Sequence, residues 1–202
     1  KNMNEQILKR NEFFEENFAD LDLADTLLEA KSFESCSFTQ CSFNEATLKQ
    51  CKFVDCEFRA CDASNAKLTG TKFSGVVFEE CKLLGVDWTR ADWPRYAAPG
   101  KLAFRKSLLD YCNFFGVSLP ELIMEECRVV GADFREADFT KASFIYSVFT
   151  ETMFGRTKLA NADFSEATGY ALDIRDNLIK GAKFTRSEAI GLLYGLDIEL
   201  VD

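Results

Sequence analysis

The residues of this chain that could carry chemistry are eight cysteines, 33 acidic and 24 basic residues, with no histidine among 202 residues. Without an imidazole, Ser-His-Asp and Cys-His nucleophiles and histidine-ligated zinc are excluded. Catalysis would need a carboxylate, lysine, tyrosine or thiol, and acid-base catalysis would need paired carboxylates in a cleft. The placement of the thiols and carboxylates therefore decides between an enzyme and a non-catalytic protein.

The cysteines are separated by multiples of five residues, except between Cys81 and Cys112. They are Cys36, Cys41, Cys51, Cys56, Cys61, Cys81, Cys112 and Cys127. Eight thiols without the paired spacing of a small secreted scaffold fit a reducing cytoplasm. No apolar run approaches the ~20 residues of a membrane span, and no charged-then-apolar leader is present, so we expect a cytoplasmic protein.

The same spacing governs the large apolar residues. Steps of five meet one at every position of residues 13–93 except Ala63, and at every position of residues 104–184 except Gly169. Eighteen of the 20 phenylalanines occupy this position, which we call the large position. The position two residues earlier, the small position, holds mostly small residues and all eight cysteines.

A period of five fits neither an α-helix nor a straight strand. Five residues turn a helix by ~500°, and an odd repeat sends successive large residues of a strand to opposite faces. The backbone must therefore turn once every five residues, and four turns close a square coil. Residues twenty apart match in type, so we predict an all-β, right-handed quadrilateral β-helix in which like residues stack. The predicted core includes Phe33, Phe38, Phe53, Phe58, Phe73, Phe78, Phe134, Phe139 and Phe144.

The stacking places Cys41, Cys61 and Cys81 in one column at ~4.8 Å spacing. A packed interior without histidine or tetrahedral clustering disfavours a metal site, and parallel side chains disfavour the disulfide torsion. We interpret the cysteines as small buried apolar residues and expect neither a metal nor a cofactor.

The repeat also predicts boundaries. Residues 1–12 form an N-terminal cap, residues 13–186 form the β-helix, and residues 187–202 form a C-terminal segment with a short α-helix between Ser187 as N-cap and Gly195 as stop. Eleven residues separate Trp93 from Phe104, a phase break near residues 94–103 that we interpret as a net insertion of one residue, without a long projecting loop. Gly169 and Tyr170 form a second irregularity, expected to weaken a coil.

The carboxylates lie almost entirely at outward positions of the predicted rod. A convex rod makes a poor active site, so we expect no enzyme activity. The net charge of −9 disfavours nucleic acid and anionic membranes and favours a basic protein partner. If the phase break is one bulged residue, three faces are modestly acidic and the fourth is neutral.

Tandem units such as Ala132-Asp133-Phe134-Arg135-Glu136 and Ala137-Asp138-Phe139-Thr140-Lys141 resemble those of pentapeptide-repeat proteins. The segments 84–88, 93–94 and 196–200 are similar to those of the topoisomerase-protecting Qnr, MfpA, AlbG and McbG group. This resemblance implies a DNA-shaped decoy that binds DNA gyrase or topoisomerase IV and protects it from a quinolone, albicidin or microcin. It also implies an end-to-end homodimer through the C-terminal segment, with Ile190, Leu193, Tyr194, Leu196 and Ile198 as interface residues.

Charge density tests the DNA-mimic hypothesis. A dimer ~80 to 100 Å long would carry one net charge per ~5 Å, against one per ~1.7 Å in duplex DNA, so the total charge is a weak mimic. Two local clusters are better candidates for partner binding: Asp22, Asp25, Glu45 and Asp62, and Asp133, Glu136, Asp173 and Asp176. A generic interaction scaffold with another partner, and a carboxylate-based enzyme, remain the alternatives.

Overall fold

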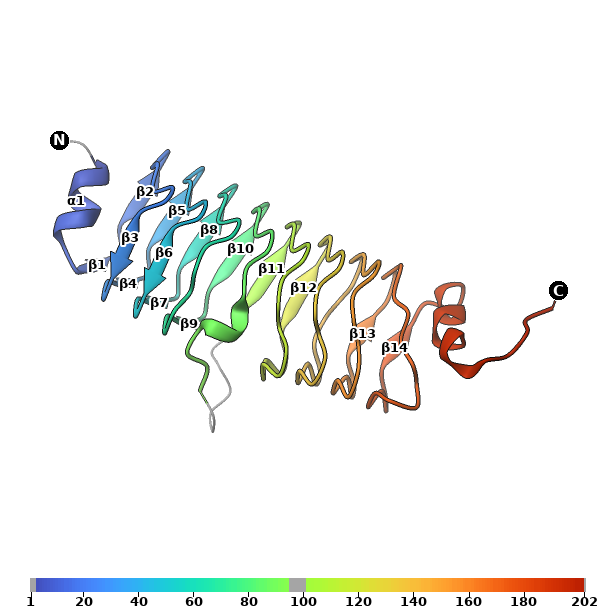
Figure 1. Ribbon diagram of the computed structural model, residues 1–202. Helices are drawn as coiled ribbons and strands as arrows, with labels where there is room; N and C mark the ends of the chain where they lie inside the picture. Colours follow the sequence, from blue (N-terminus) through green and yellow to red (C-terminus); the bar gives the residue numbers. More distant parts are fainter. Residues whose placement is uncertain (1–2, 95–100, 202) are drawn as a thin grey trace.

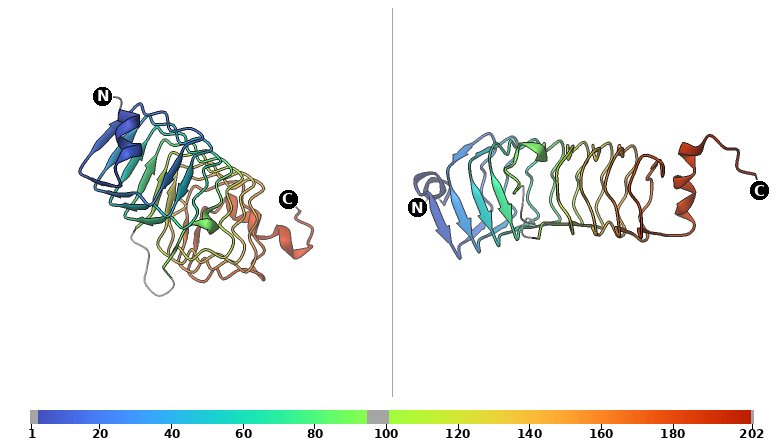
Figure 2. Two further views of the ribbon diagram at one scale, coloured as in Figure 1. Left: turned by 60° about the vertical axis from the view of Figure 1, so that its left-hand side comes forward. Right: turned by 90° about the horizontal axis from the view of Figure 1, so that it is seen from below.

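The computed structural model describes residues 3–94 and 101–201. The chain forms a rod of stacked coils, with the helix α1 (Met3–Lys9) at the N-terminal end and two short 3-10 helices at the C-terminal end (Figures 1 and 2). The rod is a right-handed quadrilateral β-helix, as the five-residue period predicts. At ~4.8 Å per coil, the 34 large positions of the two runs give a length of ~40 Å.

Each coil has four sides, which we name after the first large residue on them: the Phe13, Phe18, Leu23 and Leu28 faces. Parallel pairing joins residues twenty apart, for example Phe33 with Phe53 and Phe53 with Phe73. The Phe13 face holds β1 (Glu12–Phe14), β4 (Ser32–Glu34), β7 (Lys52–Val54) and β9 (Lys72–Ser74). The Phe18 face holds β2 (Asn17–Ala19), β5 (Ser37–Thr39), β8 (Glu57–Arg59), β10 (Val77–Glu79), β11 (Ala103–Arg105), β12 (Ile123–Glu125), β13 (Asp163–Phe164) and β14 (Lys183–Phe184). The Leu28 face holds β3 (Leu27–Glu29), β6 (Thr47–Lys49) and the 3-10 helix η1 (Trp88–Arg90).

The corners of the coil are made by left-handed residues. The residue two after the large position has a positive φ at nearly every corner, from Glu15 (φ 50) to Gly181 (φ 74). At many corners the third residue after the large position also donates its N–H to the large residue's carbonyl, as Ala46 does to Phe43 at 2.9 Å. A hydrogen-bonded turn with a positive φ at its third residue has the form of a type II turn. On the Leu23 face the coils are joined by isolated parallel bridges.

The interior is a set of stacked columns. The rings of Phe33 and Phe53 stack with centroids 5.0 Å apart, and those of Phe53 and Phe73 stack at 5.5 Å. Large residues at adjacent sides meet edge to face, as Phe33 and Phe38 do at 5.3 Å. All nine predicted core phenylalanines are buried. Stacked and edge-to-face arrangements are both favourable for aromatic rings, so one residue type can fill every side of the coil.

The small position also has a hydrogen-bonding pattern. The thiols of Cys61 and Cys81 donate to the carbonyls of Phe38 and Phe58, both at 3.3 Å, and the hydroxyl of Ser147 donates to the carbonyl of Met124 at 2.7 Å. All eight cysteines are buried and free. The slot beside each large residue therefore accepts a small side chain, and Cys, Ser and Thr can also donate to the carbonyl there, whereas Ala fills the space without a hydrogen bond.

The phase break is larger than the sequence analysis predicts. Phe78 pairs with Phe104, an offset of 26 residues instead of twenty, and β10 and β11 remain neighbours in one sheet. The net insertion is therefore six residues, and the prediction of one was wrong. Phe104 follows Trp93 directly as the next large residue in the coil. Every later residue therefore lies one face away from its predicted side. The sequence analysis also predicts that no long loop projects at the break, but residues 95–100 lie outside the described residues.

The irregularity at Gly169 and Tyr170 does not leave the interior empty. Gly169 takes a left-handed conformation (φ 74) at a large position, and the next side chain, Tyr170, turns into the core and is 4% exposed. Its ring packs on Phe164 and Phe184 with centroids 5.6 and 5.5 Å away. Glycine is needed because a Cβ at this position would lie 2.7 Å from Thr150 Oγ1 and 3.0 Å from the backbone nitrogen of Thr150.

Both ends of the rod are covered. At the N-terminus, Ile7 of α1 is fully buried, and the ammonium of Lys31 donates to the carbonyls of Leu8 (3.1 Å) and Arg10 (2.6 Å). At the C-terminus, the predicted helix consists of two 3-10 helices, η2 (Glu188–Leu192) and η3 (Tyr194–Leu196).

The predicted helix signals at the C-terminus were wrong in detail. Ser187 precedes η2 without a side-chain hydrogen bond, and Gly195 lies inside η3, which ends at Asp197 in a left-handed conformation (φ 52). The N–H of Leu193 donates to the carbonyl of Ile190 and that of Leu196 to the carbonyl of Leu193, both at 3.0 Å, which is the three-residue hydrogen-bond spacing of a 3-10 helix.

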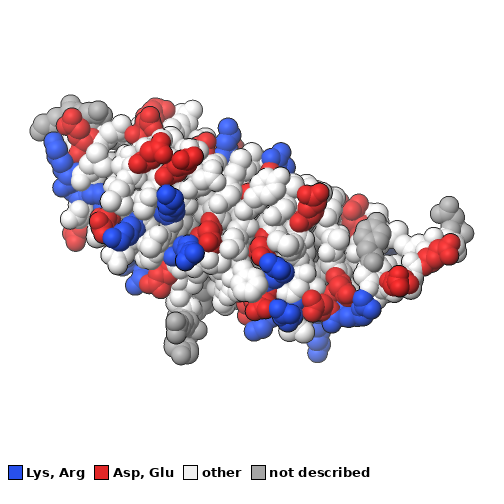
Figure 3. All heavy atoms as spheres, viewed as in Figure 1, with Lys and Arg blue, Asp and Glu red and all other residues white. Residues whose placement is uncertain are grey.

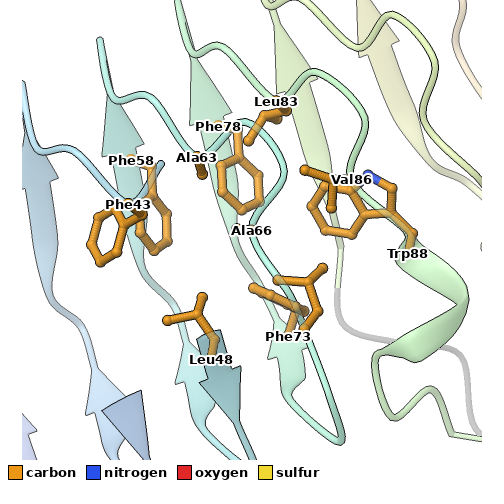
Figure 4. Close-up of a pocket in the computed structure, with 11 residues that line it drawn as sticks. Phe43, Leu48, Phe58, Ala63, Ala66, Phe73, Phe78, Leu83, Val86 and Trp88 are labelled. Atoms are coloured by element: carbon orange, nitrogen blue, oxygen red, sulfur yellow. The ribbon is translucent and has the colours of Figure 1, made fainter. Parts of the chain in front are cut away.

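Ala63 leaves a gap in the core. It is the one large position of the first run without a large side chain, and an internal cavity of about 20 Å³ lies beside it (Figure 4). The cavity is lined only by apolar residues, among them Phe43, Phe58, Phe78 and Trp88. A void of this size and lining is expected to stay dry.

Candidate partner-binding surfaces

The first acidic cluster lies on one face without basic partners. Asp22 and Asp62 are joined through Ser42 in one row of the Leu23 face, and Asp25 and Glu45 occupy successive corners of the same face. Asp22, Asp25 and Glu45 are exposed, and Asp62 is half-buried. Within residues 3–94 and 101–201, none of these four carboxylates takes part in an ion pair.

Local hydrogen bonds orient two of these carboxylates. Asp22 Oδ1 accepts the N–H of Ala24 at 3.2 Å, and Asp62 Oδ1 accepts the N–H of Ser64 at 2.9 Å. Each carboxylate is thereby held at the face with its second oxygen free of that bond. The cluster therefore presents negative charge on a face whose coils are joined by parallel bridges.

The second acidic cluster is largely neutralised. It lies on the Leu28 face, one side away from its predicted position, because the insertion has six residues. The guanidinium of Arg135 pairs with Asp133 through Nε (2.9 Å) and Nη2 (2.7 Å), and Arg156 pairs with Glu136. The hydrogen bond with Glu136 raises the pKa of Arg156, and the nearby Asp176 adds to this effect.

Asp173 contributes to the attachment of the C-terminal segment and does not form part of an open acidic surface. Its carboxylate pairs with Arg175 at 3.0 and 2.8 Å, and the same guanidinium donates to the carbonyl of Gly195. The hydrogen bond from Arg175 lowers the pKa of Asp173. The residue thus fastens η3 to the last coil.

Charged side chains are distributed unevenly along the rod. In Figure 3, acidic side chains gather near the N-terminal end of the side in view, whereas acidic and basic side chains alternate along its lower edge toward the C-terminal end. After the six-residue shift, the Leu23 face carries Asp22, Asp25, Glu45, Asp62, Asp110 and Glu151 against Lys82 and Arg128. The sequence analysis could not identify this face from its charges, because the wrong insertion length assigned the charged residues after the break to the wrong faces.

The predicted interface residues of the C-terminal segment differ in exposure. Ile190 is 46% exposed and Ile198 is 55% exposed, whereas Leu193 and Leu196 are half-buried. The side chain of Tyr194 lies outside the described residues. Leu200 and Val201 extend the exposed apolar surface.

No metal-binding constellation was found among the described residues, which contain no group of three or more Cys, Asp or Glu side chains suited to an ion. Burial raises the pKa of the Cys56 thiol to about 11 and those of Cys112 and Cys127 to about 12. Thiols protonated over this range are poor nucleophiles and ligands. Among residues 3–94 and 101–201, no helix combines the length and hydrophobicity needed to cross a bilayer.

Comparison with family models decides the family. A model described as a pentapeptide repeat region matches residues 31–114, and a model of pentapeptide repeats in eight copies matches residues 130–168. Together they span more than half of the chain. The chain belongs to the pentapeptide-repeat family. No curated protein matches it significantly.

Solved structures of pentapeptide-repeat proteins share its fold. QnrB1, a plasmid-mediated fluoroquinolone resistance protein, in a trypsin-treated variant form, is 21% identical, with a TM-score of 0.64 over 92% of this chain and all of that one. Full-length QnrB1 is 20% identical, with a TM-score of 0.60 over 90% of this chain and all of that one. HetL, involved in heterocyst differentiation regulation in the cyanobacterium Nostoc, is 14% identical, with a TM-score of 0.50 over 86% of each chain. At these identities the likeness establishes the fold of this pentapeptide-repeat chain.

Proposed function

We propose that this pentapeptide-repeat protein is a non-catalytic decoy that binds a type II topoisomerase, DNA gyrase or topoisomerase IV, at its basic DNA-holding surface and protects it from an inhibitor such as a quinolone. The observation that carries the proposal is the unpaired acidic cluster of Asp22, Asp25, Glu45 and Asp62 on the Leu23 face. The fold shared with QnrB1 is consistent with it, but a fold hosts many functions and does not by itself assign one.

The local charge density of this cluster is that of a nucleic-acid strand. Four carboxylates occupy three successive coils, or ~14 Å at ~4.8 Å per coil, which is one charge per ~3.5 Å. One strand of duplex DNA carries a charge every ~3.4 Å along the axis. A basic groove that tracks a phosphate backbone would therefore meet a similar spacing here. Because Asp133, Glu136 and Asp173 have arginine partners, the proposal assigns contact to the first cluster only.

The proposal includes a homodimer through the C-terminal segment. Ile190, Ile198 and Leu178 are 46%, 55% and 61% exposed at this end, so large apolar side chains there are open to contact with a second copy. Two rods joined there would present one continuous body ~80 to 100 Å long. An acidic cluster would then lie near each distant end.

The test is DNA supercoiling by purified gyrase in the presence of a quinolone, with this protein titrated from substoichiometric amounts to excess. Rescue of supercoiling supports a protective decoy, and inhibition without rescue supports contact without protection. No effect at any ratio contradicts the proposal and favours a scaffold for another partner. Rescue should weaken as salt rises, since exposed charges are screened.

A charge-matched pair of variants separates the cluster from the total charge. The cluster variant carries Asp22→Asn, Asp25→Asn, Glu45→Gln and Asp62→Asn. The control variant carries Glu12→Gln, Glu15→Gln, Glu34→Gln and Glu121→Gln, which remove the same charge from exposed positions of the Phe13 face. Loss of rescue in the first variant alone is expected; equal loss in both would assign the effect to bulk charge.

A further inference from the structure

A strip of apolar side chains follows the acidic cluster on the Leu23 face. Over four successive coils the outward positions of this face carry half-buried Leu or Val side chains beside an Asp–Arg pair. An exposed tyrosine stands at each of the two corners, Tyr111 (68% exposed) and Tyr146 (61% exposed). We call this surface the apolar strip; it consists of Leu84, Leu108, Tyr111, Val130, Tyr146 and Val148.

The charges within the strip cancel and are fixed in place. The side chain of Asp110 is only 7% exposed; it accepts the N–H of Val130 at 3.1 Å and pairs with the guanidinium of Arg128, with Nε at 3.1 Å. Arg128 is half exposed and lies across the face. The strip thus combines apolar area with tyrosine and arginine, the residue types enriched where protein interfaces gain most of their affinity.

The strip is also pre-organised for binding. A Cβ at Gly131 would lie 2.8 Å from two ring carbons of Tyr111, so the ring rests on backbone where only glycine leaves room. Arg128 is held by the carboxylate of Asp110, and parallel bridges join the backbone beneath it from coil to coil. Side chains ordered before association lose less conformational entropy on binding.

We infer that the apolar strip is a second contact surface, which binds an apolar surface lying beside the basic surface of the partner. The inference rests on the proposed function, because the acidic cluster fixes where the partner lies. The cluster occupies three coils and the strip the next four, so one partner following the face for ~34 Å reaches both. Lys82 lies between the two surfaces.

The composition of the face selects a protein as the occupant. The phosphates of a nucleic acid or of an anionic bilayer would be repelled by the acidic cluster. A second copy laid antiparallel would set the acidic cluster opposite the last three coils of the face, which carry Glu151 and a single basic residue, Arg128, that is already paired with Asp110. A protein with adjacent basic and apolar patches complements both parts of the face.

The test measures binding of the whole chain to immobilised gyrase holoenzyme by interferometry at ~50 and ~500 mM salt, a range that separates screened from unscreened contacts. The strip variant carries Tyr111→Ser, Val130→Ser and Tyr146→Ser. The matched control carries Phe14→Ser, Val54→Ser and Met153→Ser, which remove apolar groups from the other faces. Thermal melts establish that each variant is folded, and Tyr146→Ser alone replaces the triple variant if that one is not.

We expect the strip variant to bind at least ~10-fold more weakly at both salt concentrations, with an unchanged dependence of affinity on salt, because hot-spot side chains contribute at this level. The control should bind like wild type. Wild-type affinity in the strip variant would overturn the inference and leave the proposed function standing. Absence of binding by the wild type would overturn both. A change in self-association of the strip variant, seen by sedimentation, would make a second copy the occupant and also overturn the inference.

Discussion

At the residue scale, each position of the five-residue unit has one environment and accepts a narrow set of side chains. The large position meets stacked and edge-to-face rings, and the small position offers one carbonyl to a thiol or hydroxyl. The exceptions are therefore informative. Ala63 leaves a cavity, whereas Gly169 does not, because Tyr170 supplies the missing ring.

Filling the cavity should stabilise the protein. Ala63→Leu places an aliphatic side chain where every neighbouring coil has a large one, and we expect a gain of ~1 kcal/mol, or a melting temperature higher by ~2–4 °C. Differential scanning calorimetry measures this. Ala19→Leu adds the same atoms to an exposed position of β2 and should change little. A lower melting temperature for Ala63→Leu would mean that the cavity cannot admit the side chain.

Buried thiols make the fold sensitive to alkali. In the unfolded chain a cysteine ionises near its ordinary pKa of 9.0, whereas burial raises the pKa of Cys56 to about 11 and those of Cys112 and Cys127 to about 12. The folded state therefore holds protons that the unfolded state releases. This contribution to stability is complete below pH 9 and is lost as pH rises through 11 and 12.

The measurement is the denaturant midpoint between pH 7 and pH 11 under reducing conditions. The wild type should lose stability above pH 9. A variant with Cys56→Ala, Cys112→Ala and Cys127→Ala should still fold, since alanine occupies the same slot at Ala132 and Ala137. Its stability should decrease less steeply with pH, because the three thiols that titrate are gone. Identical slopes would show that these thiols do not titrate on unfolding.

At the element scale, the coil tolerates an insertion at one corner without losing its register. β10 and β11 pair directly across the six-residue insertion, and the ring of Phe78 stacks on Phe104 at 5.4 Å. On the near side, Trp93 stacks on Phe73 and its indole N–H donates to the carbonyl of Trp88 at 2.8 Å. The coil closes on both sides of the break by its usual contacts.

Deletion of residues 95–100 should therefore leave the fold intact. Phe104 would then follow Trp93 by five residues, and the twenty-residue register would be continuous. We expect a circular dichroism spectrum like that of wild type and a melting temperature within a few degrees, since the direct pairing of β10 with β11 is unchanged. Deletion of residues 130–135, of equal length but inside a coil, should unfold the protein. The supercoiling assay on the first variant then tests whether the six residues contribute to function.

The fold could be predicted from the sequence because the period of five admits one regular solution, and burial of Phe33, Phe53 and Phe73 in one stack follows from it. The insertion length could not, because a phase shift of one and a shift of six look alike in a five-residue repeat. That ambiguity moved the second acidic cluster to the wrong face. Arg135 pairs with Asp133 in the same coil, and Arg156 reaches Glu136 from the next coil; spacing alone does not give the direction of either side chain.

At the whole-molecule scale, the rod has distinct surfaces along its length. The acidic cluster lies near the N-terminal end, the apolar strip follows it on the same face, and the exposed apolar tail lies at the far end. A rigid rod keeps the distances between these surfaces constant. Binding at one surface therefore orients the others.

The proposed dimer gives the prediction at this scale. Ile190→Asp with Ile198→Asp places two charges on the exposed tail, and we expect sedimentation to give a monomer of 22.8 kDa with an unchanged circular dichroism spectrum. Leu27→Asp places a charge on an equally exposed residue near the other end, and we expect its mass in sedimentation to equal that of the wild type. A mass unaffected by the tail substitutions would place the interface elsewhere.

The regular offset between coils gives the rod a length that changes only in fixed steps. Each additional twenty residues lengthen the rod by one step of ~4.8 Å and return every side chain to the face it had before. Duplication of residues 132–151 would move the acidic cluster and the tail one step apart without altering either. A partner that contacts a single surface would bind the lengthened rod with unchanged affinity, and a partner that contacts both would bind it with altered affinity.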